Sequence, residues 1–161
     1  ADANRFVNFY ERQLADATPT DFVNASIASP IPNSPGDSLR LLYVKGWRKG
    51  DKRRMALGND CPHPLYAKVN IGKQPAGDTW MLVDAKSSHV YLPASGQGFT
   101  TSDLANGVLI KLPGKSWRIL DLVPFNATLA KRMTQIIQDD VEDQLDDDKR
   151  ELQTIADNYV F

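Results

Sequence analysis

The feature that most constrains the fold of this chain is a change in its hydrophobic period after residue 123. Between residues 39 and 123, apolar residues occur in short runs separated by Gly, Pro, Asn, Asp or Ser, as is typical of β-strands. From residue 126 onward they recur every three or four positions, as is typical of an amphipathic helix. Successive strands without intervening helices favour an antiparallel sheet, so this order of segments predicts an α+β fold.

Seven segments of the middle region have the length and composition of strands. They are residues 39–47, 53–57, 65–71, 79–84, 88–92, 108–112 and 116–122. The first two flank a polar turn at residues 48–52, and the fourth and fifth are joined by a short turn, so each pair is predicted to form a hairpin. We therefore expect a curved antiparallel sheet of about six strands within residues 39–123.

The N-terminal segment, residues 1–28, is predicted to be helical. Within residues 4–16, apolar and aromatic side chains recur at a helical spacing on one face. Residues 21–28 fit a short second helix or turn, for which Thr20 would serve as the N-cap.

The C-terminal segment, residues 126–159, is predicted to form a long amphipathic helix that starts at Asn126, a good N-cap. The alternative is two helices separated near residues 146–148. We expect the apolar stripe to be buried against the sheet or in an obligatory interface. With 161 residues the chain has the length of one ordinary domain, so residues 1–161 are predicted to form a single domain.

Charge is strongly segregated along the chain, although the total is only −1. Residues 45–54 hold six cations and one anion, whereas residues 139–148 hold seven carboxylates and no cation. Opposite fields of this kind steer the encounter with charged partners.

The basic segment has three interpretations. It is a solvated hairpin tip with its tryptophan packed on the sheet, or a surface for an acidic protein or another anionic surface, or a nucleic-acid site in which cations hold phosphates and the indole stacks on a base. The sequence pI of about 6.1 weighs against nucleic acid. The candidate partner-binding residues are Lys45, Trp47, Arg48, Lys49, Lys52, Arg53 and Arg54.

The acidic segment is interpreted as a solvated helix face or as a docking surface for a basic partner, with Asp146, Asp147 and Asp148 as candidate binding residues. Calcium loops of the EF-hand type need a glycine turn, and no glycine follows Gly114. The apolar stripe continues through the acidic segment, which places the carboxylates on the outer face of the helix.

Reactive side chains are few. The single cysteine, Cys61, excludes an intrachain disulfide and a multi-cysteine zinc site, and two histidines, His63 and His89, exclude a histidine-rich metal site. We expect no cofactor. A nucleophilic cysteine needs a base or a helix N-terminus to lower its pKa, and the prolines that follow Cys61 argue against a helix there.

The sequence therefore favours a non-catalytic interaction domain, a subunit or assembly factor, that docks a protein partner through the basic hairpin and the acidic helix. One alternative is a carrier of a small ligand or lipid, with an apolar pocket between the sheet and the C-terminal helix. The side chains proposed to line that pocket are Trp80, Tyr91, Trp117 and Phe125. The third hypothesis is a hydrolase that uses Cys61 and His89, and on balance we expect no enzyme.

Two expectations concern the location of the protein. No apolar run approaches the roughly 18 residues of a membrane span, so none is expected. The chain begins Ala1-Asp2-Ala3, which fits either a removed targeting peptide or a trimmed terminus. If Ala1 is a processed terminus, we expect an exported or organelle-lumenal protein.

Overall fold

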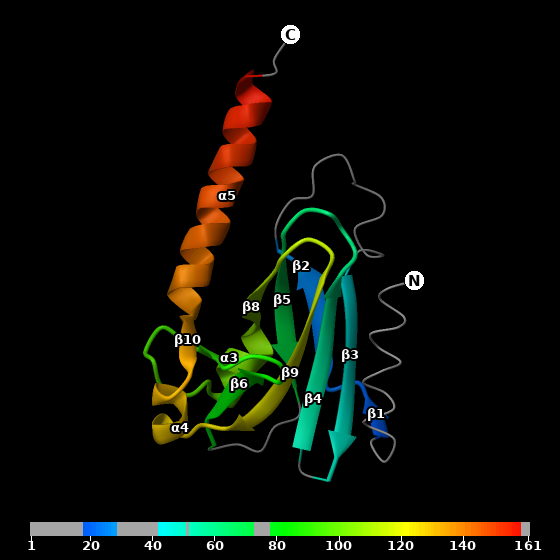
Figure 1. Cartoon of the computed structure of the whole chain (residues 1–161), viewed down its shortest axis with the longest axis vertical. Coiled ribbons are helices and arrows are strands. Elements are labelled where there is room, and N and C mark those ends of the chain that lie inside the picture. Colours follow the sequence, from blue (N-terminus) through cyan, green and yellow to red (C-terminus); the bar gives the residue numbers. More distant parts are fainter. Residues whose placement is uncertain (1–17, 29–41, 51, 73–77, 159–161) are drawn as a thin grey trace.

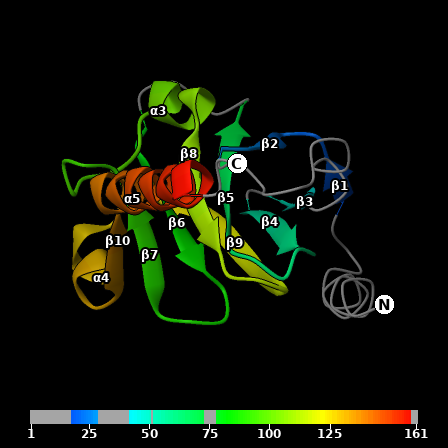
Figure 2. The ribbon, with the colours of Figure 1, turned by 90° about the horizontal axis from the view of Figure 1, so that it is seen from above.

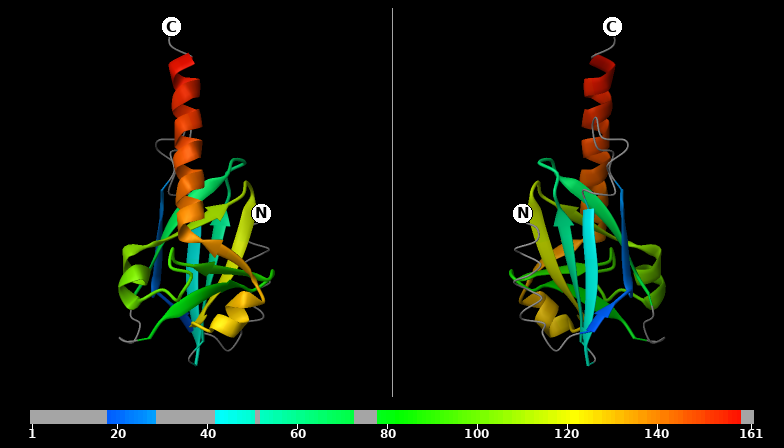
Figure 3. Two further views of the ribbon diagram at one scale, coloured as in Figure 1. Left: turned by 90° about the vertical axis from the view of Figure 1, so that its left-hand side faces the viewer. Right: turned by 90° about the vertical axis from the view of Figure 1, so that its right-hand side faces the viewer.

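Two β-sheets packed face to face form the body of the molecule, and one long helix runs along their side (Figures 1 to 3). This computed structural model describes residues 18–28, 42–50, 52–72 and 78–158. The described strands are β1 (Thr18–Thr20), β2 (Val23–Ile27), β3 (Leu42–Lys49), β4 (Lys52–Asn59), β5 (Leu65–Ile71), β6 (Trp80–Asp84), β7 (His89–Leu92), β8 (Val108–Leu112), β9 (Ser116–Pro124) and β10 (Thr134–Ile137). The described helices are α3 (Thr101–Asn106), α4 (Ala127–Lys131) and α5 (Gln138–Asn158).

The larger sheet has seven strands in the order β1-β3-β4-β9-β6-β7-β10, and the smaller has three in the order β2-β5-β8. Neighbouring strands are antiparallel except β10, which pairs with β7 in parallel. The prediction of a mixed α+β fold with antiparallel pairing and a C-terminal helix is confirmed. None of the helices within the described residues has the length and apolar character needed to cross a bilayer.

Both predicted hairpins are present. Strands β3 and β4 pair along their full length, and Lys49 opposes Lys52 next to Gly50, whose φ of 61° suits a tight turn. Strands β6 and β7 pair through Leu82 and Tyr91.

The prediction of one curved sheet of about six strands is wrong, because the described strands divide between two sheets. Strands β5 and β8 leave the larger sheet and pair with each other and with β2. Each sheet thereby buries one apolar face against the other, which a single sheet cannot do. The alternation of side chains shows which residues point inward but not which sheet a strand joins.

The helix or turn predicted for residues 21–28 is also wrong. Residues 23–27 form β2, in which Val23 and Ala25 face the core and pair with Ile71 and Val69 of β5. Thr20 lies in β1, where it opposes Gly46, so it does not cap a helix. The side chains alternate with a period of two, and that pattern outweighs the capping signal. The helix predicted for residues 4–16 lies outside the described residues.

Residues 126–159 form neither one continuous helix nor two helices separated near residues 146–148. They form α4 and α5, which are separated by residues 132–137. Asn126 caps α4 as expected, since its side-chain oxygen accepts the N–H of Leu129 at 3.0 Å. The chain then turns, and residues 134–137 form β10 before α5 begins at Gln138. The segment Thr134-Gln135-Ile136-Ile137 is rich in β-branched residues, and the free edge of β7 supplies its hydrogen-bond partners.

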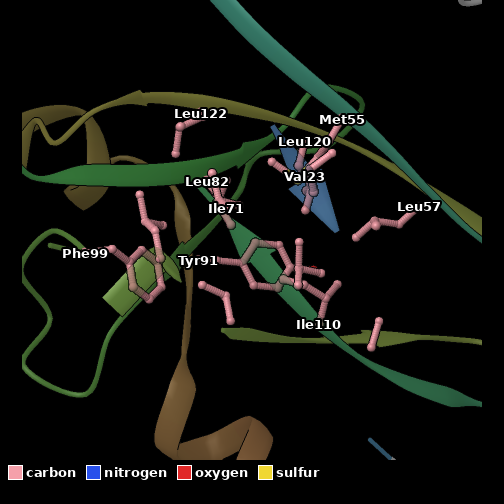
Figure 4. Close-up of a cluster of buried hydrophobic side chains, with 14 of the residues drawn as sticks. Val23, Met55, Leu57, Ile71, Leu82, Tyr91, Phe99, Ile110, Leu120 and Leu122 are labelled. Atoms are coloured by element: carbon pink, nitrogen blue, oxygen red, sulfur yellow. The ribbon is translucent and has the colours of Figure 1, made fainter. Parts of the chain in front are cut away.

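The main core fills the space between the sheets (Figure 4). Tyr91 from the larger sheet lies in the middle of this cluster, beside Ile110 of the smaller sheet. The cluster comprises Phe22, Val23, Met55, Leu57, Ala67, Val69, Ile71, Leu82, Tyr91, Phe99, Leu104, Val108, Ile110, Leu112, Leu120 and Leu122. A second cluster packs Ala130 of α4 against the outer face of the larger sheet.

Asn59 fixes the corner where the chain passes from the larger sheet to the smaller one. The side chain is fully buried at the end of β4. Its Nδ2 donates to the carbonyl oxygens of His63, Leu112 and Pro113 at 2.9–3.1 Å, and its Oδ1 accepts the Cys61 N–H at 2.9 Å. One amide thus joins the turn before β5 to the turn after β8 and satisfies backbone groups that sheet pairing does not reach.

Candidate functional site

The cations of the β3–β4 hairpin fall into two groups. Those nearer the sheet are engaged with the body of the molecule. Arg54 makes two bonds to Asp121, from Nε at 2.6 Å and from Nη2 at 2.9 Å. The Arg53 guanidinium lies 5.7 Å from the centre of the Phe22 ring, which is a cation–π distance. The exposed cations at the tip are Arg48, Lys49 and Lys52.

Trp47 is only 3% exposed and packs against Ala56 and Ile119 on the outer face of the larger sheet. The Lys45 ammonium lies 5.4 Å from the centre of its ring. The tryptophan thus packs on the sheet, as in the interpretation of the segment as a hairpin tip. The indole does not present a stacking surface to a partner.

The three candidate aspartates differ in what they contact. Asp146 is exposed, and Asp147 pairs with Arg150 one turn further along α5. Asp148 accepts the hydroxyl of Tyr66 at 2.6 Å. Burial raises the pKa of Tyr66, and the bond to Asp148 raises it further. Asp148 therefore anchors α5 to the smaller sheet, whereas Asp146 and Asp147 face outward.

The first half of α5 packs on the outer face of the smaller sheet and the second half does not. Val141 and Leu145 cluster with Tyr66, and the Gln138 amide bonds with both backbone groups of Leu109 in β8. After residue 148 the helix continues beyond the ends of both sheets (Figures 1 and 3). In this projecting half Ile155 is 53% exposed, and Leu152 is half-buried. The apolar stripe expected in a core or interface is thus buried only at its beginning.

The structure does not bring the basic hairpin and the acidic helix together. The hairpin tip lies at one end of the long axis and the C-terminal end of α5 points toward the other (Figure 1). The two charged regions are therefore separate surfaces: the basic one is at the hairpin tip, and the acidic one is on the half of α5 that packs on the smaller sheet.

A pocket of about 310 Å³ lies between β8, β10 and the start of α5. Residues from both sheets and from the first turns of α5 contribute to it. Its lining comprises Tyr91, Lys111, Pro113, Arg118, Gln135, Ile136, Asp140, Val141 and Gln144. This size is at the lower end of the range for small-molecule sites.

Arg118 and Tyr91 form the polar inner part of this pocket, next to Asp84. Asp84 is buried and accepts the N–H groups of Lys86 and Ser87 at 2.8 and 3.1 Å, while its second oxygen lies 3.6 Å from Arg118 Nη1. Burial raises the pKa of Tyr91, the Arg118 charge lowers it and the Asp84 charge raises it. Within the described residues, Arg118 Nε is buried without a hydrogen-bond partner.

The residues of the hypothetical hydrolase are not assembled into a catalytic pair. Cys61 is buried at the Asn59 corner, where its carbonyl accepts the Lys115 N–H. His89 begins β7, and its Nδ1 lies 2.6 Å from the Ser87 hydroxyl. His63 is exposed in the turn before β5. Within the part of the chain that the structure describes, no hydrogen bond joins Cys61 to either histidine.

The sequence placed a carrier's pocket between the sheet and the C-terminal helix, and of the four side chains proposed to line it only Tyr91 lines this pocket. The charged residues were missed, although a signal for them was present. In β9 the inward-facing positions are 116, 118, 120 and 122, and Arg118 is the charged residue among them. In β6, Asp84 occupies the inward-facing position after Trp80 and Leu82. A charge at a core-facing position of a strand needs a partner or a function.

Comparison with known proteins gives no match: no protein-family model, curated protein or solved structure is similar to this chain. Its function must therefore be argued from its own surfaces.

Proposed function

We propose that this protein is a non-catalytic interaction domain, and that its main docking surface is α5. The observation that carries the proposal is the projecting half of the helix, which continues after Asp148 without support from either sheet. A helical segment of about ten residues is only marginally stable by itself in water. A partner that packs on Leu152 and Ile155 would bury apolar surface and stabilise this segment.

The partner proposed for α5 is an amphipathic helix in which cations flank an apolar seam. Positions 141, 145, 148, 152 and 155 share one face of α5, so Leu152 and Ile155 extend the face that packs on the smaller sheet. Asp140, Asp147 and Glu151 lie along one side of this stripe. Lysine or arginine residues beside the partner's seam would pair with them, as flanking charges do in coiled coils.

The hairpin tip is proposed as a second, separate contact for an acidic or otherwise anionic protein surface. The exposed cations Arg48, Lys49 and Lys52 would make this contact. Arg53 and Arg54 are not included, because they are engaged within the molecule. Charged groups at such a rim act chiefly on association rate and orientation.

The other two hypotheses have less support. Of the side chains proposed to line a carrier's apolar pocket, only Tyr91 lines the pocket beside α5. Trp80 packs against the inter-sheet core, Phe125 packs near α4, and Trp117 contacts Tyr43. The hydrolase would need Cys61 and His89 to meet. Neither arrangement supports the corresponding function as well as α5 supports docking.

The proposal is tested with a synthetic helical peptide that has leucine at seam positions and lysine at flanking positions. Its binding to the full chain is followed by fluorescence polarisation. Replacing Leu152 and Ile155 together by serine should weaken binding by about tenfold or more. The midpoint of chemical unfolding should stay nearly unchanged, because the projecting half packs on neither sheet.

Two controls make this test specific. Replacing Gln153 and Thr154 by serine and alanine alters the same half of α5 away from the stripe, and binding should be retained. Replacing Arg48, Lys49 and Lys52 by serine should change neither peptide binding nor the unfolding midpoint. Equal binding of a peptide with glutamate in place of lysine, or a large loss of stability in the double serine variant, would contradict the proposal.

A further inference from the structure

The pocket between β8, β10 and α5 collects hydrogen-bond donors from three strands. Arg118 comes from β9, Lys111 from β8 and Tyr91 from β7. The Lys111 ammonium lies 5.5 Å from the centre of the Tyr66 ring and 3.4 Å from Gln144 Oε1, at the limit of a hydrogen bond. An ammonium has three N–H groups, so it retains capacity to donate. The Tyr91 hydroxyl stays protonated at neutral pH and is therefore also a donor.

The guanidinium of Arg118 is incompletely satisfied where it stands. Its Nη1 is 3.6 Å from Asp84, which is an ion pair but too long for a hydrogen bond. Asp84 directs its other oxygen to two backbone N–H groups and is held in place by them. Arg118 Nε has no partner among the described residues, although its atom is buried. The Arg118 side chain is nevertheless 30% exposed, so its terminal N–H groups are the ones that can reach a ligand, and a charged group with donors open to a pocket is suited to an anion.

The carboxylates around the pocket limit the charge of that ligand. Asp84 lies behind Arg118, and Asp140 of α5 contributes to the lining. The two carboxylates offset the two cations, Arg118 and Lys111, so the pocket has little excess positive charge. It therefore repels a monoanion less than a dianion such as hydrogen phosphate. Ile136, Val141 and Pro113 supply apolar surface for the remainder of the molecule.

We propose that this pocket binds a small organic monocarboxylate. Its carboxylate group accepts hydrogen bonds from Arg118 and Lys111, Tyr91 donates to it from the floor, and its apolar part lies against Ile136 and Val141. The volume of 310 Å³ corresponds to about ten water molecules in the liquid, which suits a molecule of similar size and excludes a long-chain lipid. This site is distinct from the docking surface on the projecting half of α5.

The probes for this site are benzoate and hexanoate, titrated into the full chain and followed by NMR. Both should shift the Arg118 Nε–Hε resonance and the backbone amides of Lys111 and Asp140 in a saturable way. Benzamide, which has the shape of benzoate without its charge, should bind at least about tenfold more weakly. Inorganic phosphate should also bind more weakly than benzoate.

Variants identify the residues that hold the carboxylate. Lys111→Met and Arg118→Lys should each weaken benzoate binding about tenfold or more. Arg132→Met removes the same charge from an exposed position outside the pocket and should leave binding unchanged. Unfolding curves establish that each variant is folded, and Lys111→Met decides the question if Arg118→Lys does not fold.

Three results would overturn the inference. One is the absence of saturable shifts with both carboxylates below about 10 mM. Another is equal binding of benzoate and benzamide, or tighter binding of phosphate. The third is a loss of affinity in Arg132→Met as large as that in Lys111→Met.

Discussion

Replacing Gln138 by alanine should destabilise the protein far more than the size of the side chain suggests. The Gln138 amide accepts the Leu109 N–H at 2.8 Å and donates to the Leu109 carbonyl at 3.0 Å. Strand β8 is an edge of the smaller sheet, so this side chain takes the place of a neighbouring strand. Alanine would leave both backbone groups unpaired beneath the start of α5.

The expected loss follows from these two bonds. A polar group that is buried and loses its partner costs about 1–3 kcal/mol, and both Leu109 groups are partly buried. Alanine recovers about 0.4 kcal/mol through its higher helix propensity. The free energy of unfolding should therefore fall by about 2–4 kcal/mol, a large part of the roughly 5–15 kcal/mol typical of a domain.

The assay is urea unfolding followed by far-ultraviolet circular dichroism, with the slope of free energy against urea compared between variants. Gln153→Ala, at an exposed position of the same helix, is the matched control and should change stability by less than about 0.5 kcal/mol. A Gln138→Ala variant as stable as the control would refute the reasoning, because the two bonds to Leu109 would then contribute nothing.

Gln138→Glu tests the same bonds through pH. An ionised glutamate accepts the Leu109 N–H but offers no donor to the Leu109 carbonyl, whereas a protonated one restores both bonds. The folded state should therefore raise the pKa of this glutamate, and the stability it adds should be present at low pH and lost as pH rises through that pKa. The deficit relative to the natural chain should shrink between pH 7 and about pH 4. A deficit that is constant over this range would argue against the geometry.

Two further predictions concern buried polar side chains. Asn59→Ala removes the four hydrogen bonds that join two turns at the corner, and should cost about 3–5 kcal/mol in chemical unfolding; a loss below about 1 kcal/mol would show that the turns hold without it. Burial and Asp148 raise the pKa of Tyr66, so above about pH 10 the unfolded chain releases this proton before the folded one, and stability falls as pH rises. Tyr66→Phe should make that alkaline decline shallower, and identical slopes in the two proteins would contradict the assignment.

The parts of the fold that could be predicted are those encoded in neighbouring residues. The β3–β4 hairpin has a turn with glycine between two alternating strands, and Asn126 is a capping residue directly before α4. The division into two sheets could not be predicted, because it depends on the pairing of β2 with β5, whose paired positions are 40 to 48 residues apart in the chain. The alternation in each strand is the same whichever sheet it joins.

Residues 134–137 form a strand where the sequence predicted a helix, and the reason is similar. Ile136 and Ile137 fit the helical stripe as well as they fit β10, and only the presence of the β7 edge decides between them. For the candidate site, the charges could be found in the sequence but their roles could not. Both Trp47 and Asp148 belong to charged segments of the sequence. In the structure Trp47 packs against Ala56 and Ile119, and Asp148 accepts a hydrogen bond from Tyr66.

The direct passage of β10 into α5 has a mechanical consequence. Ile137 ends the strand and Gln138 begins the helix, so no loop separates β10 from α5 (Figure 1). A partner that pulls on the far part of α5 would therefore load β10 directly. The part of that force directed along β10 would be shared by the four pairs from Thr134–His89 to Ile137–Leu92, because hydrogen bonds between strands cross from one strand to the other. The helix is in this sense a lever that acts on the pairing of β10 with β7.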